Sequence, residues 1–253
     1  MDLNFTWELL LLFFFVAILA GFIDAIAGGG GLICIPVLLL AQIPPLNALA
    51  TNKIQGMAGS LTASLTMIKK RVVNPRQIVF AAIMSFVGAA IGTIIVHFIN
   101  VSVLDIFIPI VLILIGLYFL LVPNMGDIEK KPRISEKSFN TIVVPSIGFY
   151  DGVLGPGTGS FFSLANIALR GQQIITATGH AKVLNFASNI ASVIVFALSG
   201  KVLWVVGGLM IIGQIIGAYL GSLMVINKGG KLIRPLVVIM CFLMVARYLY
   251  DKF

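Results

Sequence analysis

Four charged residues lie inside long apolar runs of this sequence: Asp24, Lys53, Asp151 and Lys182. A charge at the centre of a membrane-spanning helix costs about 2.5–3.5 kcal/mol, so it usually faces the protein interior or a cavity and has a function. Two lysines could attract a small anion, and two carboxylates could carry a proton. The alternatives are that each lysine extends its ammonium to the membrane surface, and that each aspartate caps a nearby helix.

The charged residues recur in the same order in two halves of the chain. The stretch 21–24, "GFID", matches 148–151, "GFYD", and a glycine-rich stretch follows each. A helix carrying polar residues comes next in both halves, "ALATNKIQGMAGS" at 48–60 and "ATGHAKVLNFASN" at 177–189. Shared order, residue type and spacing indicate an internal duplication.

The glycine-rich stretches, residues 28–31 and 155–159, predict breaks between helices inside the membrane. Four consecutive glycines destroy a helix, although the alternative is that they pack helices closely. Broken backbone is tolerated at that depth where it faces protein or a polar cavity. A helix N-terminus that follows such a break offers N–H groups and a positive dipole end to an anion. The expected anion site comprises Gly29, Gly30, Gly31, Asn52, Lys53, Gln55, Gly157, Thr158, Gly159, Lys182, Asn185 and Asn189.

Three residues are candidates for proton coupling: Asp24, Asp151 and His180. His180 lies two residues before Lys182 and is expected to reach the same cavity, unless it is only a histidine at a helix end. The four amide side chains of the site could equally well hydrogen-bond between helices. "GPGTGS" lacks the G-x-x-x-x-G-K-[ST] pattern of a nucleotide-binding loop, so nucleotide binding is excluded. No metal or cofactor is expected.

The composition is that of a polytopic membrane protein without a soluble domain. The chain is 59% hydrophobic and 10% charged, against about 25% charged residues in a soluble domain. The net charge of +8 does not indicate a nucleic-acid partner, because most basic residues lie in short loops beside apolar runs, the pattern of cytoplasmic membrane loops. These loop cations are Lys69, Lys70, Arg71, Arg76, Lys130, Lys131, Arg133, Lys137, Arg170, Lys228, Lys231 and Arg234.

The apolar runs predict two halves of five helical segments each. The second segment of each half, 31–43 or 158–169, is short for about 30 Å of hydrocarbon. If both short segments cross, with the acidic N-terminus outside, every basic loop lies on one side and the halves are inverted repeats. If they are re-entrant, the Arg170 region changes side. The expected segments are 7–27, 31–43, 47–68, 78–98 and 102–122, then 139–155, 158–169, 174–199, 202–225 and 233–250.

The expected fold is therefore an all-α polytopic membrane protein with eight long spans and two short broken ones. Residues 1–122 form the first repeat, 123–138 a charged cytoplasmic loop, and 139–253 the second repeat.

With these motifs in order, the chain resembles the sulfite exporter TauE/SafE family of membrane permeases over nearly its whole length. The motifs are "GFIDAIAGGGGLICIP" with "ALATNKIQG", and "GFYDGVLGPGTGSFF" with "ATGHAKVLNFASN". The resemblance implies a transporter of sulfite, sulfonates or related anions in a bacterial-type inner membrane. It draws attention to Asn52, Lys53, Lys182 and the glycine loops. The second half has His180-Ala181-Lys182 where the first has Thr51-Asn52-Lys53, so a symmetric site is not expected.

Together these observations favour a secondary transporter of small anions, working by alternating access around the two breaks, and not an enzyme. One alternative is a passive anion channel. The other is an intramembrane aspartyl protease using Asp24 and Asp151, which is disfavoured because two nearby lysines favour ionisation of both carboxylates. The expected partners are the anion and the lipid bilayer. The sequence leaves open whether the chain forms a homo-oligomer.

Overall fold

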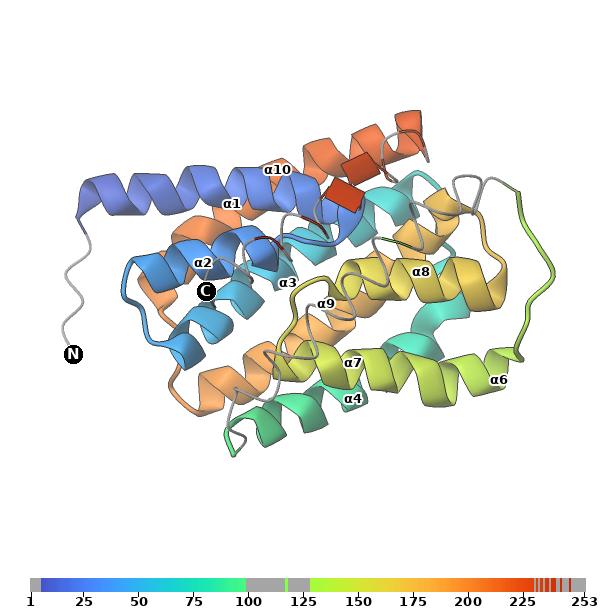
Figure 1. Ribbon diagram of the computed structural model, residues 1–253, viewed down its shortest axis with the longest axis horizontal. Coiled ribbons are helices and arrows are strands. Elements are labelled where there is room, and N and C mark those ends of the chain that lie inside the picture. Colours follow the sequence, from blue (N-terminus) through green and yellow to red (C-terminus); the bar gives the residue numbers. More distant parts are fainter. Residues whose placement is uncertain are drawn as a thin grey trace.

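The computed structural model describes residues 6–98, 117, 128–229 and scattered residues between 231 and 246, and the regular structure of this part is helical (Figure 1). The expected segments 102–122 and 233–250 fall largely outside these residues. The helices are α1 (Trp7–Ala27), α2 (Gly31–Leu40), α3 (Pro45–Lys69), α4 (Pro75–Val96), α6 (Glu136–Ser138), the π-helix η2 (Phe139–Val143), α7 (Val144–Val153), α8 (Thr158–Arg170), α9 (Ile174–Leu198) and α10 (Trp204–Lys228).

Local sequence signals explain where these helices begin and end. The Thr6 hydroxyl accepts a hydrogen bond from the Leu9 N–H at the start of α1, and Asn74 caps α4 immediately before Pro75. Helix α1 ends at Gly28, whose φ of 77° is the left-handed conformation that glycine adopts without strain. Helix bounds therefore follow the apolar segments closely.

Four of the described helices, α1, α4, α9 and α10, are long and apolar enough to span a membrane. Helix α3 is 25 residues long, as α9 and α10 are, but it carries Asn52, Lys53 and Gln55, which are buried inside the protein. The all-α membrane fold is confirmed. Helices α6, η2 and α7 follow one another without interruption and make one helical stretch of residues 136–153.

The basic loops gather at one end of the molecule, called here the basic end. Lys130 and Arg133 donate backbone hydrogen bonds to Gly171 and Leu169. The loop after α3 reaches α9, where Val73 packs beside Gly179. At the opposite end Asn47 donates to the carbonyl of Lys201, and His97 contacts Ser199. In Figure 1 the basic end lies on the right and the start of α1 on the left.

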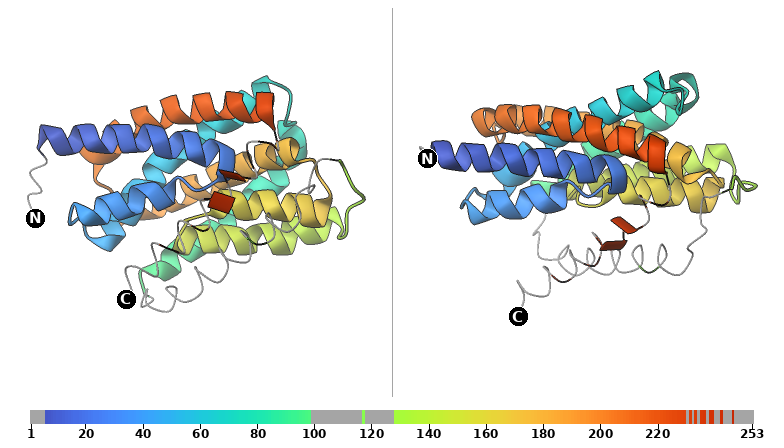
Figure 2. Two further views of the ribbon diagram at one scale, coloured as in Figure 1. Left: turned by 45° about the horizontal axis from the view of Figure 1, so that its top comes forward. Right: turned by 90° about the horizontal axis from the view of Figure 1, so that it is seen from above.

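The short helices α2 and α8 each form a hairpin with the helix before it, and the two hairpins open in opposite directions (Figure 1). The α1–α2 hairpin opens toward the end opposite the basic end. The hairpin of residues 136–170 opens toward the basic end, which places Arg170 with the other loop cations. The tips of both hairpins lie in the middle of the molecule (Figures 1 and 2).

Each half supplies one helix to each of two closely packed pairs, α1 with α10 and α4 with α7. Glycines allow the close approach: a Cβ on Gly92 of α4 would overlap the carbonyl of Phe149, and one on Gly217 of α10 would overlap the carbonyl of Ile18. This is the small-residue packing typical of membrane helices. Helices α3 and α9 contact one another, and α3 packs against α1 and α10 while α9 packs against α4 and α7, so the two helices form the centre of the fold.

Candidate functional site

The two glycine breaks touch at the centre of the molecule. The Ser160 hydroxyl donates a hydrogen bond to the carbonyl of Ala27, and Gly28 lies against the backbone of Gly159 and Ser160. A side chain on Gly28 would collide with that backbone. Within the two glycine-rich stretches the helix is interrupted at residues 28–30 and 154–157, because Gly31 and Thr158 already begin α2 and α8, so the contact joins the first interruption to the first turn of α8. Both short helices therefore begin where the two halves meet.

Lys53 of α3 forms an ion pair with Asp151 of α7, in the other half of the chain. Its Nζ lies 2.8 Å from Asp151 Oδ1, and both side chains are 2% exposed. The same ammonium donates to the backbone carbonyl of Asp151. The lysine therefore satisfies its charge inside the protein and does not extend to the membrane surface.

Lys182 of α9 forms the reciprocal pair with Asp24 of α1. Its Nζ lies 3.4 Å from Asp24 Oδ2 and also donates to the Asp24 carbonyl. The lysine side chain is 1% exposed, whereas that of Asp24 is 15% exposed. This second pair is longer and less enclosed than the first, so it is the pair with more freedom to open.

Each aspartate also lies at the start of the short helix in its own half. The Gly30 N–H donates to Asp24 Oδ1 at 3.1 Å, immediately before α2. The Thr158 hydroxyl donates to Asp151 Oδ1 at 2.7 Å, at the first residue of α8. A carboxylate at a helix N-terminus is stabilised by the helix dipole. Asp24 thus accepts a backbone N–H at the start of α2, whereas Asp151 accepts only the Thr158 hydroxyl, and each aspartate pairs with a lysine as well.

A small cavity of about 20 Å³ lies between these groups, about the room needed for one water molecule. Its lining combines the backbone of both breaks with polar side chains from five helices. The lining residues are Asp24, Gly28, Gly30, Gly31, Asn52, Lys53, Gln55, Gly56, Asp151, Gly155, Asn185, Asn189 and Gln214.

The cavity contains most of the unsatisfied buried polar atoms found in the described part of the chain. Of the four side-chain atoms there that are buried without a hydrogen-bond partner, three belong to its lining: Gln55 Oε1, Asp151 Oδ2 and Gln214 Oε1. Buried polar atoms are normally paired with protein or water. Their concentration here marks a place for water or for a polar ligand that carries a proton.

The four amides of the expected site lie together on the cavity wall. Gln55 donates to Asn52 at 2.8 Å, and Asn189 donates to Asn185 at 3.2 Å. One amide pair comes from each half. Their hydrogen bonds run along a helix, so the amides do not link α3 to α9 through these contacts.

Some expected residues lie beside the cavity and do not form its lining. Gly29, Gly157, Thr158 and Gly159 belong to the breaks or the first turn of α8, and the Thr158 hydroxyl is already bound to Asp151. Lys182 does not line the cavity either: its ammonium pairs with Asp24 and lies close to Gly159.

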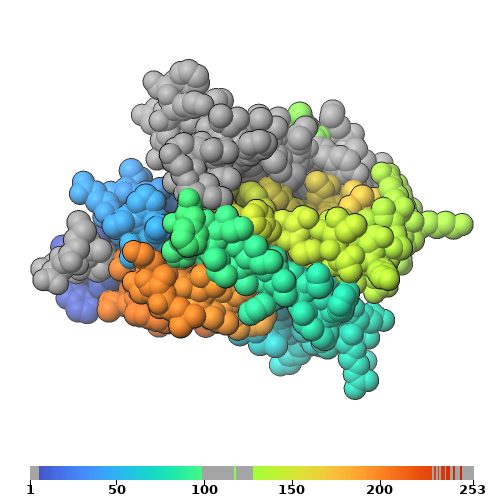
Figure 3. Space-filling view, turned by 90° about the horizontal axis from the view of Figure 1, so that it is seen from below, coloured from blue at the N-terminus to red at the C-terminus, as the bar shows by residue number. Residues whose placement is uncertain are grey.

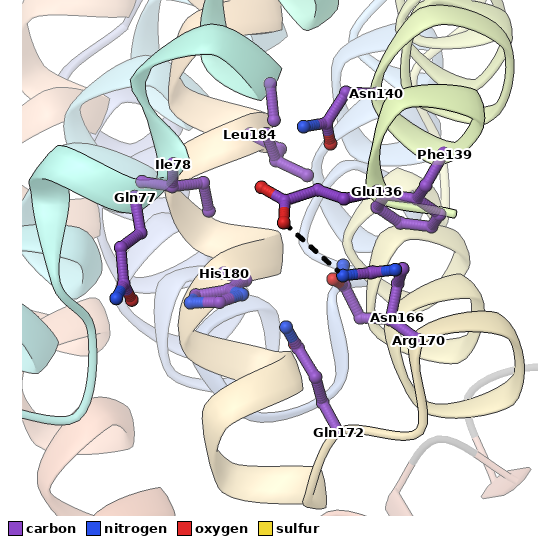
Figure 4. A pocket seen from close by; sticks show the side chains of 11 residues that line it. Gln77, Ile78, Glu136, Phe139, Asn140, Asn166, Arg170, Gln172, His180 and Leu184 are labelled. Carbon is purple, nitrogen blue, oxygen red and sulfur yellow. Dashed lines mark ion pairs between the residues drawn. The ribbon is translucent and has the colours of Figure 1, made fainter. Parts of the chain in front are cut away.

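His180 does not join this group, although it is only two residues from Lys182. It lines a separate pocket at the basic end (Figure 4). Each residue of an α-helix is rotated by about 100° from the one before, so residues two apart point to nearly opposite sides of the helix. His180 and Lys182 therefore cannot face the same cavity.

The sequence reasoning missed Gln214, which projects from α10 toward the cavity. It lies close to Gly21 and Gly59, where an added Cβ would collide with its side-chain oxygen. The signal was present, because Gln214 is the one strongly polar side chain in the middle of the apolar run 202–225. An amide buried in such a run is costly unless it has a partner or a function.

Comparison with known proteins gives a consistent result. The family model "Sulfite exporter TauE/SafE" matches residues 13–248. A "Probable membrane transporter protein" of Haemophilus influenzae is 51% identical over 245 residues, covering 97% of this chain and 96% of the relative. "Probable membrane transporter protein YfcA" of Escherichia coli K12 is 47% identical over 239 residues, covering 94% and 89%. "Probable membrane transporter protein ORF9" of Sinorhizobium sp. is 46% identical over 248 residues, covering 98% and 95%. No solved structure matches.

Proposed function

Because the chain belongs to the sulfite exporter TauE/SafE family, we propose that it is a secondary transporter of small sulfur-containing anions such as sulfite or a sulfonate. The observation that carries the proposal is the pair of reciprocal buried ion pairs around one cavity, Lys53 with Asp151 and Lys182 with Asp24. Two cations at the meeting point of two helix breaks suit an oxyanion.

Charge balance favours the entry of a proton together with the anion. Each lysine is neutralised by an aspartate, so an anion entering the cavity alone would leave a net negative charge in a buried site, which is costly. Protonation of the aspartate releases its lysine to pair with the anion and keeps the net charge unchanged. A protonated group also supplies a donor to the unpartnered oxygens of Gln55 and Gln214. Asp24 is the favoured proton carrier because its pair is the longer and more exposed one.

The proposed mechanism is alternating access between inverted halves. The two hairpins open toward opposite ends of the molecule, and each lysine is paired across the boundary between halves, as expected for inverted repeats around a central site. The cavity has room for about one water molecule, so a sulfur oxyanion enters only when one hairpin moves. The basic end faces the cytoplasm of a bacterial inner membrane under the positive-inside rule.

The test is flux in proteoliposomes of purified protein, with sulfite, thiosulfate and a small sulfonate as substrates. Wild type is compared with Lys53→Met, Lys182→Met and Asp24→Asn. Lys70→Met is the matched control, because it removes an exposed lysine from the loop after α3. Size-exclusion profiles in detergent establish that each variant is folded.

We expect flux in wild type and in Lys70→Met, stimulated by an inward proton gradient for inward flux. It should fall at least tenfold in folded Lys53→Met and Lys182→Met. In Asp24→Asn the residual flux should no longer respond to the gradient. Normal flux in both lysine variants would refute the site, and wild-type flux that ignores the gradient would indicate a passive anion channel.

A further inference from the structure

A second polar pocket lies at the basic end, between α4, α6, η2, α8 and α9 (Figure 4). Its volume is about 290 Å³, near the lower limit for small-ligand pockets. It shares no lining residue with the central cavity. Its polar lining consists of Gln77, Asn140, Asn166, Arg170, Gln172 and His180, together with Glu136 at the mouth.

Arg170 supplies a cation whose charge is only weakly compensated. Its Nη1 donates to the carbonyl of Ile134 at 2.8 Å, which fixes the guanidinium in place. Its Nη2 lies 3.6 Å from Glu136 Oε2, beyond the 2.7–2.9 Å of a charge-assisted hydrogen bond. The arginine side chain is 17% exposed and that of Glu136 is 67% exposed. The carboxylate therefore lies in solvent and leaves guanidinium donors available.

The surrounding side chains add unused hydrogen-bonding groups. Gln172 Oε1 is buried without a partner, the fourth such atom in the described part of the chain; because it is an acceptor, it suits an oxyanion that carries a proton, such as bisulfite or hydrogen phosphate. Asn166, one turn before Arg170 on α8, donates to the Phe162 carbonyl and is 2% exposed. In Figure 4 the His180 ring lies across the pocket from Arg170, and the Gln172 amide extends toward the space between them. The pocket therefore contains polar groups that have no hydrogen-bond partner within the protein.

Local backbone geometry provides independent support. Phe139 and Asn140, which line the pocket, begin the π-helical turn η2 within the helical stretch 136–153. Single π turns within α-helices occur frequently at functional sites. The equivalent helix of the first half, α1, is an uninterrupted α-helix, and α2 ends in Leu38-Leu39-Leu40 where α8 ends in Arg170. The π turn and Arg170 therefore have no counterpart at the equivalent positions of the first half, although α4 of the first half also lines the pocket.

From this arrangement we propose that the pocket is a second oxyanion site, distinct from the transport site, in which Arg170 binds the anion and the Glu136 carboxylate is a tethered competitor that the anion displaces. The same chemistry fits a free oxyanion or the phosphate of an anionic lipid headgroup. An anion bound in this pocket contacts α6, η2 and α8 and also the first part of α9, the helix that carries Lys182.

The test measures binding of radiolabelled sulfate, sulfite and phosphate to the full chain in phosphatidylcholine nanodiscs. Arg170→Gln removes the guanidinium, and Glu136→Gln removes the competitor while leaving the bond between Arg170 and Ile134 intact. Arg76→Gln is the matched control, because it is an exposed arginine at the same end whose loss changes the net charge equally. Lys53→Met shows whether the signal comes from the central cavity.

We expect at least one of the three anions to bind to wild type, with affinity about tenfold or more lower in Arg170→Gln, as for the loss of a charge-assisted bond, and unchanged in Arg76→Gln. Glu136→Gln should bind about 1.5- to 5-fold more tightly, the range of an exposed ion pair, and Lys53→Met should retain this Arg170-dependent binding.

Replacement of part of the lipid by phosphatidylglycerol distinguishes the sources: loss of free-anion binding in wild type assigns the site to the headgroup, and unchanged binding assigns it to the free anion. Binding of none of the anions, or equal binding in wild type, Arg170→Gln and Glu136→Gln, would overturn the proposal, whatever the outcome of the flux measurements.

Discussion

Lys53 and Asp151 are 98 positions apart in the chain, yet their side chains form a 2.8 Å ion pair from which solvent is almost excluded. Lys182 and Asp24 repeat the relationship in the opposite sense. Each half of the protein therefore supplies the cation for the other half's carboxylate. In the folded chain neither half pairs its own buried charges, so the centre of the molecule depends on both.

The first prediction concerns the stability of this pair. Lys53→Met should lower the free energy of unfolding by about 3–5 kcal/mol, because it leaves the buried Asp151 charge without a partner. The double variant Lys53→Met/Asp151→Asn should recover much of that loss. Thermal unfolding in detergent measures both effects, with Lys70→Met as the exposed control. A double variant less stable than the single one would contradict the assignment of the cost to an unpaired charge.

The second prediction concerns the contact between the breaks. Gly28→Ala places a Cβ against the backbone of Gly159 and Ser160 at a φ of 77°. The left-handed backbone alone costs about 1–3 kcal/mol, and the collision forces the breaks apart, so flux should fall at least tenfold. Gly208→Ala on α10 is the matched control, because its Cβ meets nothing within 4 Å. Equal flux in the two variants would show that the breaks need not touch.

The third prediction tests Gln214, the cavity residue that the sequence reasoning missed. Gln214→Met keeps the volume and removes an amide oxygen without a partner, so stability should change by less than about 1 kcal/mol or increase. Flux should nevertheless fall several-fold if this amide contacts the anion. Gln173→Met, at the exposed start of α9, is the control. Unaltered flux with raised stability would make Gln214 a packing residue.

The fourth prediction concerns topology. Single cysteines at Lys70, Lys131 and Lys228 should react with a membrane-impermeant maleimide only from the cytoplasmic side, and one at Ser199 only from the opposite side, since the first three lie at the basic end. The background carries Cys34→Ala and Cys241→Ala. Labelling in spheroplasts and in inverted vesicles distinguishes the sides. Reaction of Lys131→Cys from the same side as Ser199→Cys would refute both the orientation and the inverted arrangement.

Much of the local structure could be predicted from the sequence. The apolar runs and the glycine-rich stretches located the helix bounds closely, because a chain in lipid must satisfy its backbone within each helix. The duplicated motifs identified both breaks, and the cost of charges in lipid singled out Asp24, Lys53, Asp151 and Lys182 as residues that face the protein interior or a cavity. Neighbouring residues in the chain and the surrounding bilayer determine these features, so they can be predicted without knowledge of the tertiary structure.

Only the tertiary structure decided which groups meet. The sequence spacing of Lys53 and Asp24 equally allows pairing within one half, and the crossed pairing appears only in the folded chain, which brings Lys53 of α3 to Asp151 of α7 in the other half. Gln214 lines the cavity because glycines bring α10 close to α1. His180 does not line it, because helical geometry places His180 on the side of α9 opposite to Lys182. Contacts between distant segments depend on how whole helices pack, and that packing is a property of both halves together, which local sequence patterns do not contain.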